Sequence, residues 1–324
     1  MIEVRGLTKS FDGVRAVAGI DLTVDRGELM GLLGPNGAGK TTTLNMLTGL
    51  ARPEAGTIRV AGIDCTRDPK AAQHLFGVVP DDSNLYPELT GLDNLTFCAS
   101  LYGMGRAERT ERARLLLEEF GLGDAAHRKF GGYSRGMKRR LTIAAGIIHR
   151  PAVLFLDEPT TGIDVASARQ VRQLVRDLHR GGTTILLTTH YIEEAERLCD
   201  RVAFMVEGRI VTVDTLENLL SPVSDTHVLV LVTADPTTGL TPELERLFPH
   251  LRFEVVGARE IRVESRQPIA VGPLIREIEE RGATVMEARR ERPSLESVFA
   301  RITGIHADQM KREKERKGGG GGAS

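Results

Sequence analysis

The sequence predicts an α/β fold in which helices cover a parallel sheet, followed by a smaller α+β domain. Short apolar runs at 28–34, 152–159 and 183–190 are typical of buried parallel strands. A longer amphipathic stretch at 167–180 predicts a helix between two of these strands. After residue 221 the order of the elements changes. Strands that alternate with helices indicate a parallel sheet, and the later change of order indicates a second domain.

Within the first domain, placed at residues 1–220, the segment at about 88–150 has helical periodicity and lacks strand patterns. We expect a helical subdomain there. The second domain is placed at 221–304, starting at the sequence SPVSD. The tail at 305–324 is charged and glycine-rich, which is typical of a disordered linker or a cloning scar.

The second domain has its own pattern of elements. We expect strands at 226–234, 252–257, 259–265 and 283–291 and helices at 241–248 and 272–282. This βαββαβ order is typical of a ferredoxin-like domain. A last helix is predicted at 294–304, with Leu295, Val298, Phe299 and Ile302 on one face.

Composition excludes several classes of protein. Lys and Arg number 43 against 44 Asp and Glu, so the chain lacks the charge of a dedicated nucleic-acid binder. Cys65, Cys98 and Cys199 lack the spacing of a zinc site or a disulfide framework. No apolar run approaches the roughly 20 residues that span a bilayer, and the start lacks a signal-peptide pattern. We expect a cytoplasmic protein that reaches a membrane only through a partner.

The segment GPNGAGKTT at 34–42 matches the phosphate-binding pattern GxxxxGK[ST] between a predicted strand and a predicted helix. Main-chain N–H groups of such a loop face phosphate oxygens, and the helix dipole favours negative charge. Lys40 would reach the β and γ phosphates, and the Thr41 hydroxyl would hold Mg²⁺. The alternative, a chance glycine-rich turn, is disfavoured by the flanking elements. The candidate phosphate-binding residues are Gly34, Pro35, Asn36, Gly37, Ala38, Gly39, Lys40, Thr41 and Thr42.

Two acids end the apolar strand at 152–159. A buried carboxylate is costly without a partner, so Asp157 is a candidate for holding Mg²⁺ and Glu158 for orienting the attacking water. The alternative is an exposed strand end. His190 ends the strand at 183–190 and would lie near the γ-phosphate if the two strands are neighbours. A lone histidine is otherwise more often structural.

A GTPase would read guanine with an NKxD-type motif, which the sequence lacks. Phe11, ahead of the phosphate loop, offers a stacking face for adenine instead, although a core position is an equal alternative. ATP is therefore the expected nucleotide.

Together these residues resemble the ATP-binding subunit of an ABC transporter. The resemblance implies a P-loop ATPase core with catalytic roles for Lys40, Glu158 and His190. The segment TGID at 161–164 resembles the D-loop, whose aspartate is Asp164 here. The segment YSRGM at 133–137 matches the family signature at Ser134 and Gly136, and signatures that end in Gly-Met are familiar in exporters of the daunorubicin-resistance type.

Two positions depart from the common family pattern. Arg135 replaces the first signature glycine, and Asp81 stands at the position of the Q-loop glutamine. A carboxylate at residue 81 could approach Mg²⁺ or its waters, but it adds negative charge beside the phosphates.

The resemblance implies an ATP-hydrolysing motor subunit of an exporter. It implies a homodimer, or a pair with another ATPase subunit, that closes around two ATP with Mg²⁺ and drives a separate transmembrane permease at the inner face of the cell membrane. A non-transport ABC ATPase of the translation or DNA-repair type is the alternative, disfavoured by the single set of motifs. A regulator without turnover is disfavoured because Lys40, Asp157, Glu158 and His190 are all present.

The basic stretch GGYSRGMKRR at 131–140 opens the signature helix. Met137, Leu141, Ala144 and Ile148 share one face, which we expect to be buried. The basic residues on the other face, Arg135, Lys138 and Arg139, are expected to meet solvent or the dimer seam, and no nucleic acid is expected to bind there.

Overall fold

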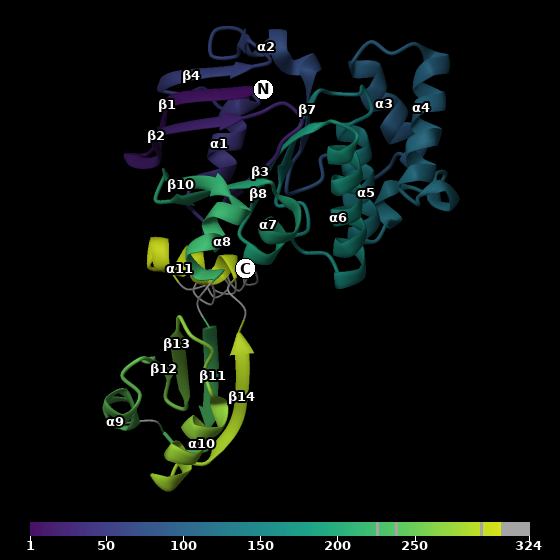
Figure 1. The fold of residues 1–324 in the computed structure, drawn as a ribbon. Helices are drawn as coiled ribbons and strands as arrows, with labels where there is room; N and C mark the ends of the chain where they lie inside the picture. Colours follow the sequence, from purple (N-terminus) through teal and green to yellow (C-terminus); the bar gives the residue numbers. More distant parts are fainter. Residues whose placement is uncertain (225–226, 237–238, 292–293, 306–324) are drawn as a thin grey trace, which may run out of the picture. The chain divides into compact units, whose positions relative to one another are not determined.

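The computed structural model describes residues 1–224, 227–236, 239–291 and 294–305. The described chain divides into two compact units, Met1–Thr215 together with 303–305, and Leu216–Ile302 (Figure 1). The boundary expected after residue 220 falls inside helix α8 (Leu216–Ser224), which contains Pro222. Ser, Pro and Asp favour turns, which is why the sequence suggests a break there. The predicted tail lies outside the described residues except for Ile305.

The central sheet of the first unit has the strand order β10-β9-β3-β8-β7-β6. Its strands are β3 (Leu29–Leu33), β6 (Phe76–Val79), β7 (Val153–Asp157), β8 (Thr184–Thr189), β9 (Arg201–Val206) and β10 (Arg209–Thr215). All neighbours are parallel except the pair β9–β10. Every residue of β3, β7 and β8 is buried, which explains their continuous apolar runs. Helix α1 (Lys40–Leu47) follows β3, α6 (Val165–Arg180) connects β7 to β8, and α7 (Ile192–Leu198) connects β8 to β9.

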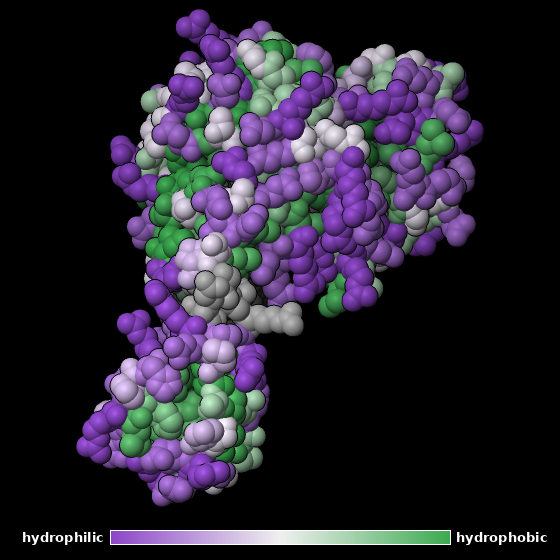
Figure 2. Space-filling view, in the orientation of Figure 1, coloured by the Kyte–Doolittle hydropathy of each residue, from purple (hydrophilic) through white to green (hydrophobic). Residues whose placement is uncertain are grey.

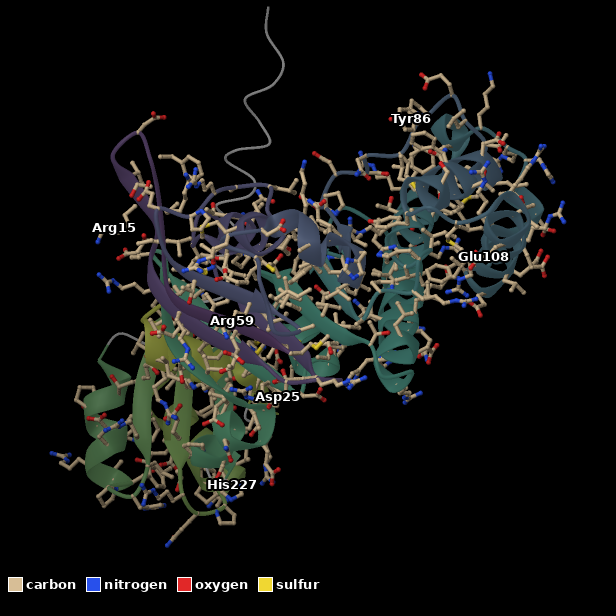
Figure 3. The ribbon with its side chains drawn as sticks, turned by 90° about the horizontal axis from the view of Figure 1, so that it is seen from above. Arg15, Asp25, Arg59, Tyr86, Glu108 and His227 are labelled. Carbon is tan, nitrogen blue, oxygen red and sulfur yellow. The ribbon has the colours of Figure 1, made fainter. Side chains whose placement is uncertain are left out.

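A second, antiparallel sheet precedes and follows the phosphate loop in sequence, and the sequence analysis did not predict it. Its strand order is β2-β1-β4-β5, formed by β1 (Ile2–Phe11), β2 (Val14–Val24), β4 (Ala55–Val60) and β5 (Ile63–Asp64), with the short helix α2 (Pro69–Ala72) following. Figure 3 shows Arg15 and Arg59 on this sheet. Its strands bury alternate residues only, so they lack the apolar runs that marked the central sheet.

The predicted helical insertion lies between β6 and β7. It contains α3 (Gly91–Leu101), α4 (Arg106–Glu119) and α5 (Arg135–Gly146), with short 3₁₀ helices at Gly123–Ala125 and Phe130–Gly132; another 3₁₀ helix, at Gln73–Leu75, directly precedes β6. A capping box starts α3, because the Thr90 hydroxyl accepts from Asp93 N (3.1 Å) and Asp93 accepts from Thr90 N. Mainly hydrophilic residues cover the visible face of this insertion (Figure 2).

The second unit confirms the ferredoxin-like order βαββαβ. Its elements are β11 (His227–Thr233), α9 (Leu240–Leu247), β12 (Arg252–Gly257), β13 (Glu260–Ser265), α10 (Val271–Glu280) and β14 (Val285–Glu291), flanked by α8 and α11 (Leu295–Thr303). The antiparallel sheet has the order β12-β13-β11-β14. On α11, Leu295, Val298 and Phe299 are buried as expected, whereas Ile302 is 40% exposed.

Among the described residues, no helix combines the length and apolar character that crossing a membrane requires.

Glycine at position 77 allows β6 to approach the end of α5. A Cβ on Gly77 would lie 1.9 Å from the main-chain oxygen of Gly146. We predict that Gly77→Ala lowers the free energy of unfolding by about 1–3 kcal/mol, because neither backbone can yield cheaply. Urea unfolding of the whole chain measures this. Gly132→Ala is the control, since the nearest atom to its Cβ is the end of Arg128 at 3.9 Å, and a change within about 0.5 kcal/mol is expected.

Candidate functional site

The predicted phosphate loop joins the end of β3 to the start of α1, and two of its glycines are sterically required. Gly39, the N-cap of α1, has φ +102°, and a Cβ there would lie 2.3 Å from the main-chain oxygen of Ala16. A Cβ on Gly34 would lie 2.0 Å from the main-chain oxygen of Met205. Only glycine lets the loop pass this close to its neighbours. The loop therefore forms a tight cradle at the N-terminus of α1.

Lys40 is the buried cation of the cradle, with 5% of its surface exposed. Its Nζ donates to the main-chain oxygens of Gly34 (2.8 Å) and Pro35 (3.1 Å) and lies 3.5 Å from Glu158 Oε1. Burial lowers the pKa of Lys40, while the negative charge of Glu158 acts in the opposite direction. The lysine is thus held at the cradle by carbonyls and by one carboxylate.

Glu158 lies at the carboxyl end of β7, 8% exposed and with φ +47°. Its Oε2 receives a hydrogen bond from the Thr161 hydroxyl (3.1 Å) and lies 2.7 Å from His190 Nδ1. His190 is this close because β7 and β8 are parallel neighbours, which was the condition set by the sequence analysis. Burial acts to raise the pKa of Glu158, but the His190 hydrogen bond and the charge of Lys40 outweigh it, so the pKa is lowered.

Asp157 lies beside Thr41, as a shared Mg²⁺ site requires. The Thr41 hydroxyl donates to Asp157 Oδ1 (3.2 Å), and the Thr188 hydroxyl donates to the same oxygen. In the part of the chain that the structure describes, no group of three or more His, Cys, Asp or Glu could hold a metal. One hydroxyl and one carboxylate nevertheless fit Mg²⁺, which usually takes its remaining ligands from phosphates and water.

Asp81 also faces this site, from the turn after β6. Burial raises the pKa of Asp81, the Arg139 charge acts to lower it, and the carboxylates of Glu158 and Asp157 act to raise it further. It lines the same cavity as Glu158 and is the second carboxyl group there. That cavity has a volume of about 470 Å³ and is lined by Ala16, Asn36, Gly37, Gly39, Lys40, Thr41, Thr42, Asp81, Glu158, Thr161 and His190.

Eight predicted site residues do not line this cavity: Gly34, Pro35, Ala38 and Asp157, and also Phe11, Ser134, Gly136 and Asp164. Phe11 ends β1 and is 50% exposed, with Lys9 Nζ 5.2 Å from the centre of its ring. Ser134 is the N-cap of α5 and accepts from Met137 N at 3.3 Å, and Asp164 is the N-cap of α6 and accepts from Ser167 N at 2.9 Å. A Cβ on Gly136 would lie 2.0 Å from Ser167 Oγ, so the N-termini of α5 and α6 are adjacent.

Comparisons with known proteins agree with this geometry. Residues 17–161 match the ABC transporter family. The chain is 40% identical over 326 residues to the daunorubicin/doxorubicin resistance ATP-binding protein DrrA of Streptomyces peucetius, covering 97% of this chain and 95% of that protein. It is 39% identical to a Nod factor export ATP-binding protein I of Burkholderia lata, covering 94% of this chain and 97% of that protein.

The chain belongs to the family of ABC transporter ATP-binding subunits.

Solved structures of this family share its fold. One ATP-binding subunit of an ABC transporter superposes with a TM-score of 0.63 at 31% identity, covering 68% of this chain and 92% of that one. A dimeric ATP-binding cassette in a post-hydrolysis state with ADP and Pi superposes with a TM-score of 0.62 at 26% identity, covering 67% and 99%. The chain is accordingly an ABC ATPase with a P-loop core.

The position predicted for Arg139 in this ABC ATPase was wrong. Arg139 is 6% exposed and does not face solvent, whereas Arg135 is exposed and Lys138 is half-buried. Met137, expected on the buried face, is also only half-buried. The turn at Pro80 and the end of β7 cover the side of α5 that carries Arg139. The helical periodicity of a sequence does not reveal that a loop from elsewhere in the chain will cover the polar face of the helix.

Glu194 on α7 is a second buried charged residue that the sequence analysis missed. It is 2% exposed, and its two carboxylate oxygens accept from the hydroxyls of Thr160 (2.7 Å) and Thr189 (2.8 Å). Thr160 follows Glu158 by two residues, and Thr189 precedes His190. Glu194 therefore joins the two segments that carry these residues.

Burial raises the pKa of Glu194, although the bonds from Thr160 and Thr189 act to lower it. The folded protein then binds this proton at a pH where the unfolded chain has lost it. The contribution of Glu194 to the free energy of unfolding is fully present below the ordinary carboxyl pKa of about 4.3. It is lost as pH rises through the pKa that Glu194 has in the folded protein.

We predict that Glu194→Gln, which does not titrate, gains stability relative to wild type as pH rises above about 4.3. Urea unfolding of both proteins across this pH range measures the difference. Glu193→Gln, at an exposed position of the same helix, is the control for removing a surface carboxylate from this helix. A pH-independent difference for Glu194→Gln would contradict the raised pKa.

Proposed function

We propose that this ABC ATPase is the motor subunit of an exporter, in which two copies close around two ATP and drive a separate transmembrane permease. The observation that carries the proposal is the convergence of Lys40, Glu158 and His190 on one cavity beside a glycine cradle. The relatives support the export role through their printed functions in daunorubicin/doxorubicin resistance, linearmycin resistance and Nod factor export.

The residues of the cradle would bind the phosphates of ATP. Lys40 and the main-chain N–H groups of residues 39–42 supply positive charge and hydrogen bonds at the start of α1. Thr41 and Asp157 would hold Mg²⁺, which when bound neutralises charge on the phosphates, and Asp81 lies within the same cavity. Phe11, beyond the cavity, offers its exposed ring to adenine.

Glu158 would orient the attacking water and accept its proton. Its lowered pKa keeps it ionised at neutral pH, which a general base requires. His190 holds the carboxylate at 2.7 Å, and the Thr161 hydroxyl binds the same oxygen. Catalysis in this arrangement consists of positioning and charge neutralisation.

The second copy would contribute Ser134, Gly136 and Asp164. Ser134 is exposed and caps α5, so the first N–H groups of that helix and its dipole favour a negative ligand. These residues lie outside their own cavity, which suits a role toward the ATP of another chain. A dimeric cassette is among the solved structures that superpose on this fold. The complete motor would then lie at the inner face of the cell membrane, against its permease.

We predict that Glu158→Gln retains ATP binding, loses about 10²- to 10⁴-fold in turnover and accumulates as a closed dimer with ATP, because the general base is lost while the cradle is kept. Phosphate release, equilibrium ATP binding and light scattering measure these three effects. Glu108→Gln, at an exposed position of α4 (Figure 3), is the control and keeps wild-type turnover. Near-normal turnover of Glu158→Gln would remove Glu158 from the reaction.

A further inference from the structure

Arg139 contacts two segments of the nucleotide site although its side chain does not line the cavity. It lies in the second turn of α5, the helix that Ser134 caps, and it is 6% exposed. Helix α5 runs beside α6 and also packs on β6 (Figure 1). A buried guanidinium needs partners for its five N–H donors, so its position has to be explained by what it binds.

Each hydrogen bond of Arg139 within the described part of the chain ends on a main-chain carbonyl. Nε donates to Pro159 O (2.8 Å) and Nη2 donates to Asp157 O. Nη1 donates to Asp81 O (3.1 Å) and to Pro80 O. One side chain thus joins the carbonyls of Asp157 and Pro159, the residues before and after Glu158, to the turn that carries Asp81.

The main chain at Glu158 requires such support. A residue other than glycine with φ +47° is in a sparsely populated conformation, which persists only where its surroundings hold it. The N–H of Glu158 donates to Thr188 O at 3.1 Å, which fixes one side of the peptide. Arg139 binds the carbonyls of Asp157 and Pro159, which fixes the chain before and after the residue.

Nearby carboxylates favour the positive charge of the buried Arg139. Burial lowers the pKa of Arg139, while the carboxylates of Asp81 and Asp157 act to raise it. Lysine would keep the charge but has a single nitrogen, which cannot follow the planar fork of a guanidinium across four carbonyls. Arginine is therefore needed here for the arrangement of its hydrogen-bond donors more than for its charge.

We infer that Arg139 is a positioning residue, which fixes Glu158 and the Asp81 turn against the signature helix. This inference rests on the proposed function, in which Glu158 serves the ATP of its own chain and Ser134 serves the ATP of the second copy. Because Ser134 and Arg139 belong to one rigid helix, a movement of α5 at the partner's ATP shifts Glu158 at its own ATP. Arg139 then couples the two sites of the dimer.

The test compares Arg139→Lys with Arg140→Lys. Arg140 is half-buried on the same helix and donates to Phe120 O (2.8 Å) and Gly121 O (3.3 Å), away from the cavity. For Arg139→Lys we expect kcat to fall about 10- to 100-fold with the Kd for ATP unchanged, since a small misplacement of a catalytic group has costs of this size. Arg140→Lys keeps both values. Equal kcat in Arg139→Lys and wild type would overturn the inference.

A double variant separates positioning from general damage. If Arg139 acts through Glu158, Arg139→Lys has no further effect on kcat once Glu158→Gln is present, because residues that act as a unit are not additive. If the two losses multiply, Arg139 acts independently of Glu158 and the inference is wrong.

Hydrogen exchange of the nucleotide-free chain tests the same contacts without hydrolysis. We expect the amides of residues 81–84 and of Glu158, Thr160 and Thr161 to exchange about tenfold faster in Arg139→Lys and at the wild-type rate in Arg140→Lys. Unchanged exchange would overturn the inference even if wild type failed to hydrolyse ATP. Failure of hydrolysis by wild type, with faster exchange in Arg139→Lys, would instead reject the proposed function and keep the positioning role.

Discussion

The site depends on the opposite charges of Lys40 and Glu158, which lie 3.5 Å apart and almost fully buried at the carboxyl edge of the central sheet. Removing both charges from water is costly, so each needs further partners. Carbonyls of the phosphate loop bind the lysine, and His190 and Thr161 bind the glutamate. This arrangement requires two features of the backbone. The phosphate loop passes so close to neighbouring main-chain atoms that only glycine fits there, and Glu158 has a left-handed conformation.

Three of the six strands of the central sheet and most residues of this cavity were predictable from sequence. Strands β3, β7 and β8 are buried on both faces and so appear as continuous apolar runs. The phosphate loop has fixed spacing between its glycines and Lys40, and the acids Asp157 and Glu158 follow a buried strand directly. In each case the residue types that the chemistry needs stand at a fixed spacing directly after a predicted strand.

The parts that escaped prediction arise from contacts between distant segments. The antiparallel sheet alternates buried and exposed residues, and its bulges interrupt the period of two. Arg139 is buried because the Pro80 turn, 59 residues earlier, folds over α5. Glu194 gains its two hydrogen-bond donors only in the fold, where β7 and β8 are neighbours and bring Thr160 and Thr189 together. None of these contacts has a local sequence signature.

The cavity and the helix N-termini at Ser134 and Asp164 would have different functions in the proposed dimer. In the proposed dimer, the cavity would bind the phosphates and carry out hydrolysis, while Ser134 and Asp164, at helix N-termini outside the cavity, would serve the ATP of the second copy. The most direct test measures phosphate release and light-scattering mass together over a range of protein concentrations. The account predicts that hydrolysis follows the dimeric fraction. Full turnover by a monomer would contradict it.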